Sequence, residues 1–310
     1  MATTTPTETS SENADEIFDS DFLDRLRAMA LRLRKRKKLR KKGLQQTPAT
    51  GFTREFKDFR PYTSKDDFRS IDWRLYARLD RLYIRLYEEI KEFHVHVVID
   101  TSASMSQPFA EKRITALKLA VSLAYMGLVG HHGVSLYHFG DQVGEPLPTM
   151  KGQGSLQRVI DYARGLEFGG ITDLERCFRE FQPSRRRYGI IFLISDLYGK
   201  DIDEAEQAIR HAAGWPGEIH LIQVNHPWEE KPHLDGEIEL VDVETREQRR
   251  LWFTSRDQKR YEMRYQQFVS DVEAECKLRH IDYQRWRTDY PFDELFLELL
   301  SRGSALASTS

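Results

Sequence analysis

The chain of 310 residues carries 47 lysines and arginines against 49 aspartates and glutamates, and the net charge of −2 excludes a strong overall attraction to nucleic acid or membranes. Its 40% hydrophobic content is typical of a globular protein, and its two cysteines, Cys177 and Cys276, lack the spacing of a disulfide framework or zinc site. Apolar runs are far shorter than the ~20 residues that cross a bilayer, so we expect a cytoplasmic protein without a transmembrane segment.

The N-terminal region divides into two parts. Residues 1–20 are rich in Ser, Thr, Asp and Glu, which predicts a disordered tail. Residues 21–43 are predicted to form a basic amphipathic helix, because apolar side chains recur at helical spacing among many Arg and Lys. Its apolar stripe consists of Phe22, Leu26, Met29 and Leu33. We expect the stripe to pack on the same chain; the alternative is that residues 22–42 bind RNA or an anionic membrane surface.

An α/β core is predicted for residues 93–227. Short apolar runs typical of strands alternate there with amphipathic stretches typical of helices. This alternation predicts a Rossmann-like, doubly wound α/β fold, in which helices cover both faces of a mostly parallel sheet. A helix, a strand and a second helix in residues 255–302 complete this core, and residues 303–310 form a second disordered tail.

An accessory β subdomain is predicted from two separate segments. Residues 82–90 alternate apolar and polar side chains, as a half-exposed strand does, within a segment spanning residues 51–92. Residues 228–254 contain two alternating runs around the string ETRE, which predicts an antiparallel hairpin inserted into the core. We expect this hairpin to pair with the strand at residues 82–90.

Polar residues follow the predicted core strands at the points where those strands end. Asp100, Ser102 and Ser104 follow the first strand, Thr172 lies in a glycine-rich loop, and Asp196 follows another apolar strand. Ligands bind at the carboxyl ends of parallel strands, and oxygen ligands of these types suit Mg²⁺. Uncharged hydroxyl ligands would leave the cation with positive charge for a partner's carboxylate. The alternative is that the Asp-x-Ser-x-Ser string only forms the turn that enters a helix.

The five positions resemble the metal-ion-dependent adhesion site of von Willebrand factor A domains. The resemblance covers the fold over about residues 93–225 and implies Mg²⁺, or another divalent cation such as Mn²⁺ or Ca²⁺, as the cofactor. It implies that Ser102 and Ser104 are direct ligands and that Thr172 is a ligand in one conformational state. It also implies that Asp100 and Asp196 act through bound water.

A second resemblance covers residues 51–302. The segment from Gly51 to Glu89, and most clearly the string DFRSIDWR at residues 67–74, is similar to the signature of the bacterial family called domain of unknown function 58. This resemblance implies action with a MoxR-type AAA+ ATPase in the assembly, maturation or remodelling of client proteins. The chain has no Walker A motif, so we expect the ATPase to be a separate polypeptide.

Two further groups of residues have a structural explanation. Mixed charges beside an aromatic residue predict a salt-bridge network that fixes the accessory segment on the core, the alternative being a partner-binding surface. The residues are Asp67, Arg69, Asp72, Trp73 and Arg74. His94 and His96 alternate with valines along the first core strand, which predicts buried or interface residues and not metal ligands.

The function expected from these observations is that of a non-enzymatic, divalent-metal-dependent protein-binding module. Its partners would be the ATPase and a client that offers an acidic side chain to the metal. One alternative is a metal-dependent phosphotransferase or hydrolase with Asp100 as nucleophile. That alternative is disfavoured because such enzymes commonly carry an acid where Ser102 stands, and because the sequence reveals no well-placed Lys or His. The other alternative is RNA or anionic-membrane binding through the basic helix.

Overall fold

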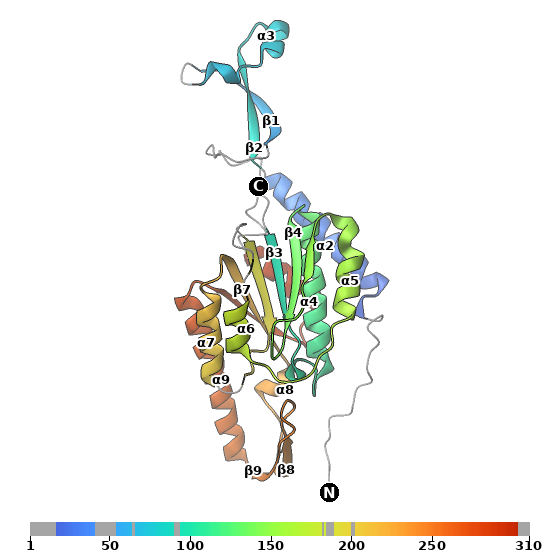
Figure 1. Cartoon of the computed structure of the whole chain (residues 1–310), viewed down its shortest axis with the longest axis vertical. Helices are drawn as coiled ribbons and strands as arrows, with labels where there is room; N and C mark the ends of the chain where they lie inside the picture. The colour runs from blue at the N-terminus through green and yellow to red at the C-terminus, as the bar shows by residue number, and fades with distance from the viewer. Residues whose placement is uncertain are drawn as a thin grey trace.

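The computed structural model describes residues 17–40, 54–63, 66–89, 94–181, 183, 189–199 and 202–302. For residues 33–40, 54–58, 85–89, 202 and 302 it describes the backbone alone. A central sheet lies between two layers of helices, and hairpins project from opposite ends of this core (Figure 1). The tail predicted at residues 303–310, and most of the one predicted at residues 1–20, lie outside the described residues.

The central sheet has six strands in the order β10-β7-β6-β3-β4-β5. They are β3 (His94–Asp100), β4 (Gly133–Phe139), β5 (Leu147–Met150), β6 (Gly189–Ser195), β7 (Gly217–Asn225) and β10 (Asp282–Arg287). All neighbouring pairs are parallel except β4 with β5. The mostly parallel sheet is therefore confirmed. The edge strand β5 was not predicted, because it has four residues and one of them is Pro148.

The strand order reverses between β3 and β6. From β3 the chain continues through β4 and β5 toward one edge, and from β6 through β7 and β10 toward the other. Such a reversal is a topological switch point, and ligands of α/β proteins bind at the carboxyl ends of the strands beside it. Asp100 ends β3 and Ser195 ends β6, so the polar residues predicted to bind metal lie at this switch point.

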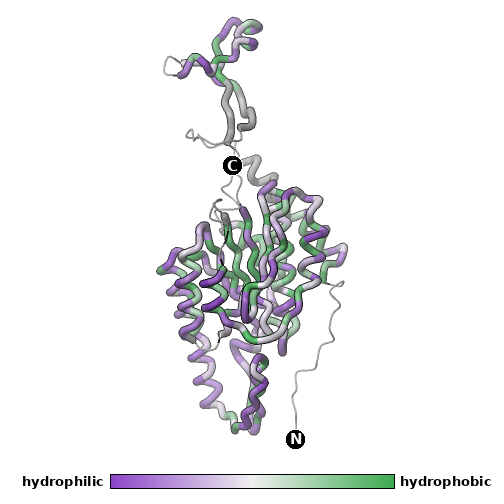
Figure 2. The backbone as a smooth tube through the Cα atoms, in the orientation of Figure 1, coloured by the Kyte–Doolittle hydropathy of each residue, from purple (hydrophilic) through white to green (hydrophobic). Residues whose placement is uncertain are grey.

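Each face of the sheet is covered by its own layer of helices. One layer comprises α2 (Ser20–Arg40), α4 (Ala110–Val129), α5 (Leu156–Arg164) and α10 (Phe292–Arg302). The other comprises α6 (Leu174–Glu180), α7 (Ile202–Ala212) and α9 (Ser255–Leu278). Figure 2 shows the apolar residues concentrated in the strands between the layers. Leu117 and Leu123 of α4 are completely buried, and each contributes roughly 2 kcal/mol of hydrophobic stabilisation.

The N-terminal helix α2 packs on the core through its apolar stripe. Phe22, Leu26 and Met29 belong to the same buried cluster as α4, and the Phe22 ring lies 5.8 Å from that of Phe292. The predicted docking is confirmed, whereas the side chain of Leu33 lies outside the described residues. The boundary of the predicted tail is wrong at residues 17–20, because two apolar residues there, Ile17 and Phe18, extend the stripe and are buried.

The two hairpins form separate sheets. Strand β1 (Arg54–Pro61) pairs with β2 (Tyr83–Glu89), and β8 (Gly236–Val241) pairs with β9 (Gln248–Phe253). Each predicted strand region is confirmed, but their union in one accessory subdomain is wrong. Strand β2 comes before the amino end of β3, whereas β8 comes after the carboxyl end of β7. Because β3 and β7 run in the same direction, the two hairpins lie beyond opposite ends of the strands (Figure 1).

The signature at residues 67–74 caps two short helices. The Asp67 carboxylate accepts a hydrogen bond from the Arg69 N–H, and that of Asp72 caps α3 (Trp73–Leu79) by accepting from the Arg74 and Leu75 N–H groups. Arg69 and Arg74 form no ion pair with any residue that the structure describes. The predicted network is therefore wrong for these two arginines, which lie on the projecting hairpin beside Trp73, a side chain that is 60% exposed.

The C-terminal part of the core follows the prediction closely. The expected helix, strand and helix appear as α9, β10 and α10, and β10 pairs in parallel with β7. Cys177 and Cys276 are free thiols buried in the second helical layer, in agreement with a packing role. Within the described ranges, no helix has both the length and the apolar composition that a bilayer crossing requires.

His94 and His96 are buried in the core as predicted. The His94 Nε2 lies 3.0 Å from the Ser135 hydroxyl, and the two histidine rings have centroids 4.3 Å apart. Burial, and secondarily the charge of His94, lowers the pKa of His96 from 6.5 to about 3. The folded protein therefore keeps His96 neutral, so its contribution to stability is complete above pH 6.5 and is lost as the pH falls toward 3.

A pH titration of stability tests this assignment. Between pH 7.5 and pH 5 the wild-type protein is expected to lose about 2 kcal/mol of unfolding free energy through His96, and the His96→Leu variant is expected to lack this loss. Urea denaturation at both pH values measures it, with replacement of the exposed His233 by glutamine as the control. An identical pH dependence in the wild-type and His96→Leu proteins would contradict the assignment.

Candidate metal site at the sheet switch point

Asp100 connects the carboxyl ends of β3 and β6. Its carboxylate is completely buried, and one oxygen, Oδ1, accepts a hydrogen bond from the Ser102 N–H at 2.9 Å. The other oxygen, Oδ2, accepts from the Ser195 hydroxyl at 2.6 Å. The Ser195 hydroxyl in turn accepts from the Leu197 N–H at 2.8 Å, so Asp100 is held from both strands.

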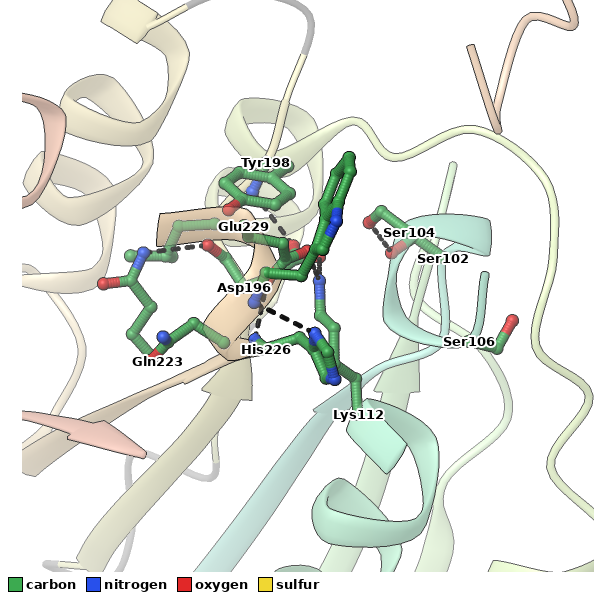
Figure 3. A network of polar contacts seen from close by, with 12 residues as sticks. Ser102, Ser104, Ser106, Lys112, Asp196, Tyr198, Gln223, His226 and Glu229 are labelled. Carbon is green, nitrogen blue, oxygen red and sulfur yellow. Dashed lines mark hydrogen bonds and ion pairs between the residues drawn. The ribbon is translucent and has the colours of Figure 1, made fainter. Parts of the chain in front are cut away.

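The two serines of the motif present adjacent hydroxyl groups. A short 3₁₀ turn at Ala103–Met105 brings the Oγ atoms of Ser102 and Ser104 to 3.0 Å from one another, and both residues are buried. Figure 3 shows these hydroxyls side by side, with Ser106 at a distance from them. Two neighbouring ligands of an octahedral Mg²⁺ site, each about 2.1 Å from the metal, lie about 3.0 Å apart. The observed spacing fits such a site.

The loop that carries Thr172 is hydrogen-bonded to the serine turn. The Gly169 N–H donates to the Thr101 carbonyl at 2.9 Å, and the Ala103 N–H donates to the Gly170 carbonyl. Gly170 has a φ of 77°, a conformation that glycine adopts without a steric penalty. Thr172 is fully buried beside these contacts, so the loop lies against the Asp100 motif as predicted.

Asp196 occupies the equivalent position after β6. It is buried, and its Oδ1 accepts a hydrogen bond from the Tyr198 N–H at 3.0 Å. The backbone carbonyl of Asp196 accepts from the Gln223 side chain on β7 at 3.0 Å. All five predicted residues are therefore buried at the same edge of the sheet, in three segments joined by hydrogen bonds.

Lys112 is a residue of the candidate site that sequence reasoning missed. It lies in the first turn of α4, is completely buried, and its Nζ is 2.7 Å from both Asp196 Oδ2 and Glu229 Oε1 (Figure 3). Burial lowers the pKa of Lys112, but the charges of Asp196 and Glu229 outweigh this effect and raise it above 10.5. The expectation that no lysine is placed to act as acid or base for Asp100 stays a prediction, since Lys112 pairs with Asp196 and Glu229. Lysine is rarely buried, so its burial could not be predicted from its residue type. The one indication in the sequence was that Lys112 closely follows the serine loop.

Glu244 is a second residue that the sequence did not reveal. It lies in the turn between β8 and β9, and its carboxylate accepts hydrogen bonds from the Thr172 N–H at 3.1 Å and the Thr172 hydroxyl at 3.2 Å. Burial raises the pKa of Glu244, hydrogen bonds from Thr172 oppose the rise, and the charge of Asp196 adds to it. The carboxylate of Glu244 is therefore hydrogen-bonded to Thr172, one of the predicted metal ligands.

Negative charge exceeds positive charge at this edge of the sheet. Four carboxylates, those of Asp100, Asp196, Glu229 and Glu244, lie here, and among the described residues Lys112 pairs with two of them, Asp196 and Glu229. Among the described residues, no lysine, arginine or histidine forms an ion pair with Asp100, and burial followed by the charge of Asp196 raises the pKa of Asp100 to about 7. A buried carboxylate without a cation is costly, so the surroundings favour an added cation.

The possible metal ligands of the site are a mixture of hydroxyl and carboxylate oxygens. The described residues contain no group of three or more His, Cys, Asp or Glu side chains placed to hold a metal. A site here would therefore depend on the Ser102, Ser104 and Thr172 hydroxyls, with carboxylates supplying charge. Hard divalent cations accept such neutral oxygens and retain several waters, so the donor set suits Mg²⁺ better than zinc.

Comparison with known proteins identifies relatives of unknown function. Uncharacterised proteins of Mycobacterium bovis and Mycobacterium tuberculosis are each 26% identical over 145 residues, which cover 45% of this chain and 46% of theirs. The chain thus matches about half the length of these curated relatives. Their similarity is confined to that shared part.

Among solved structures, the chain is similar to the conserved hypothetical protein BatB of Bacteroides thetaiotaomicron, with 14% identity and a TM-score of 0.39 over 70% of this chain and 99% of that one. It is also similar to an aerotolerance-related membrane protein of Bacteroides fragilis, with 12% identity and a TM-score of 0.39 over 68% and 97% of the two chains. A family model matches residues 58–274, which is more than half of the chain. The chain therefore belongs to the family described as protein of unknown function DUF58.

Proposed function

We propose that this protein is a non-enzymatic binding module that uses a divalent cation, first of all Mg²⁺, to bind an acidic side chain of a partner protein. The observation that carries the proposal is the pair of buried hydroxyls of Ser102 and Ser104, 3.0 Å apart, beside a buried Asp100 carboxylate that has no cationic partner among the described residues. This arrangement combines neutral ligands with unbalanced negative charge, as a hard cation requires.

The residues have distinct roles in this proposal. The Ser102 and Ser104 hydroxyls hold the cation directly, and Thr172 adds a third hydroxyl from the neighbouring loop. Asp100 and Asp196 supply charge through water. When bound, the cation supplies a Lewis-acidic position that takes a carboxylate.

The geometry supports binding better than nucleophilic catalysis by Asp100. Both carboxylate oxygens of Asp100 accept hydrogen bonds, at 2.9 Å from the Ser102 N–H and 2.6 Å from the Ser195 hydroxyl, and the side chain is completely buried. A nucleophile needs a lone pair directed at the substrate. Lys112, the nearby cation, is already held by two carboxylates.

The partner in this proposal is a MoxR-type AAA+ ATPase, together with the client that it assembles, matures or remodels. Support comes from membership of the DUF58 family and from the resemblance of the signature at residues 67–74. The acidic side chain that reaches the site belongs to the ATPase or to its client. Binding is expected to require the cation.

Metal titration calorimetry with Mg²⁺ tests the site itself. The Ser102→Ala/Ser104→Ala double variant is expected to lose at least about tenfold in Mg²⁺ affinity, because it lacks two direct ligands. Ser106→Ala is the matched control, since the Ser106 hydroxyl donates to the Ala103 carbonyl and not to the ligand pair. Equal Mg²⁺ affinity in the wild-type and double-variant proteins would contradict the assignment.

A further inference from the structure

The turn between β8 and β9 contacts both loops of the candidate metal site. Glu244 accepts hydrogen bonds from the backbone N–H and the hydroxyl of Thr172, at 3.1 and 3.2 Å. Two residues further along, an Arg246 nitrogen donates to the Gln107 side chain at 3.1 Å, just beyond the serine turn. The turn therefore bridges the Thr172 loop and the loop that follows Asp100.

The turn has a defined local structure that presents Glu244. The Asp242 carboxylate accepts hydrogen bonds from the Glu244 and Thr245 N–H groups, at 2.9 and 2.7 Å. The Asp242 N–H donates to the Glu247 carbonyl at 2.9 Å, and Arg246 takes the left-handed conformation with a φ of 61°. A compact, internally bonded turn of this kind holds the acidic side chain in a fixed direction.

The rest of the hairpin is poorly packed. Leu240 is 44% exposed and Trp252 is 70% exposed, so apolar residues of the two strands face solvent. An isolated two-stranded hairpin is marginally stable in water, and this one keeps its turn at the site through polar contacts. Such contacts contribute little net stability, so a competing ligand can displace the turn.

We propose that Glu244 closes the candidate metal site from within the chain, in the position that a partner's carboxylate takes. The inference rests on the proposed function and specifies its partner: a protein segment that presents an Asp or Glu side chain from a turn or loop and displaces the β8–β9 turn. Glu244 accepts from both donor groups of Thr172, a predicted ligand, and an acidic partner side chain has the same chemistry. The alternative, that the Glu244 contact only stabilises the fold, is one outcome of the test.

Two measurements on a Glu244→Ala variant test this closure, with Glu247→Ala as the matched control on the same turn. The first is amide exchange of the Thr172 N–H by NMR, which is expected to be at least about tenfold faster in Glu244→Ala, because a hydrogen bond to a charged acceptor is lost. The second is water-proton relaxation with Mn²⁺ as the probe, which is expected to rise when a water replaces the Glu244 carboxylate. The control is expected to match the wild-type protein in both measurements.

The outcomes separate this inference from the proposed function. If the amide of Thr172 exchanges at the same rate in Glu244→Ala and in the wild-type protein, the proposal that Glu244 closes the site is overturned. A second result also overturns it: Glu244→Ala binds Mn²⁺ and its Thr172 amide exchanges faster, but the water-proton relaxation is unchanged. Glu244 would then have only a folding role, and the proposed metal site would stand. Failure of the wild-type protein to bind Mn²⁺ or Mg²⁺ overturns the proposed function and the closure together.

Discussion

Replacing Lys112 by methionine is expected to lower the free energy of unfolding by about 3 to 5 kcal/mol, because the change leaves Asp196 and Glu229 buried without their cation. Lys112 is completely buried, and it forms 2.7 Å contacts with both carboxylates. Methionine preserves most of the side-chain volume, so the loss reports charge and not a cavity. Urea denaturation in the presence of EDTA measures it.

Lys118→Met provides the matched control on the same helix, since Lys118 is only partly buried and lies 5.7 Å above the Phe22 ring. Its expected effect is below about 1 kcal/mol. Adding Glu229→Gln to Lys112→Met is expected to restore part of the lost stability by removing one stranded charge. A loss below about 1 kcal/mol for Lys112→Met would show that the buried network does not depend on the lysine.

Asp100→Asn is expected to change stability and metal affinity in opposite directions. In EDTA, the free energy of unfolding should rise by roughly 1 to 3 kcal/mol, because an uncompensated buried charge is removed. The asparagine oxygen still accepts from the Ser102 N–H, and its amide donates to the Ser195 hydroxyl in place of accepting from it. Affinity for Mg²⁺ should fall at least about tenfold, since the site loses a negative charge.

Urea denaturation in EDTA and calorimetric titration with Mg²⁺ measure the two effects of Asp100→Asn. Replacement of the exposed Asp141 by asparagine is the control, and it should alter neither quantity by a measurable amount. If Asp100→Asn instead lowered stability in EDTA, the Asp100 carboxylate would be well compensated without a metal. That result would remove the electrostatic argument for the site.

Local patterns in the sequence were sufficient to predict the core and most of the site. An apolar run that ends on a polar residue marks both β3 and β6, and parallel strands bring such ends to one edge of a sheet. Asp100 and Asp196 could therefore be placed together from these patterns alone.

The residues that were missed depend on packing between distant segments. Lys112 is read as a solvated lysine unless its burial against α8 (Pro227–Glu230) is known, and that contact joins residues far apart in sequence. Glu244 reaches Thr172 only because the β8–β9 hairpin folds back over the switch point. The mistaken pairing of the two hairpins has the same origin, because strand alternation carries no information about which edge of the sheet a hairpin leaves.

Binding of the wild-type protein to the MoxR-type ATPase of its own organism, with and without Mg²⁺, tests the central claim most directly. The immobilised protein is expected to retain the ATPase, or the ATPase with its client, in Mg²⁺ and to release it in EDTA. The Ser102→Ala/Ser104→Ala variant is expected to bind in neither condition while remaining folded, and Ser106→Ala is expected to behave as the wild-type protein does. Equal binding in Mg²⁺ and in EDTA would contradict a metal-dependent module.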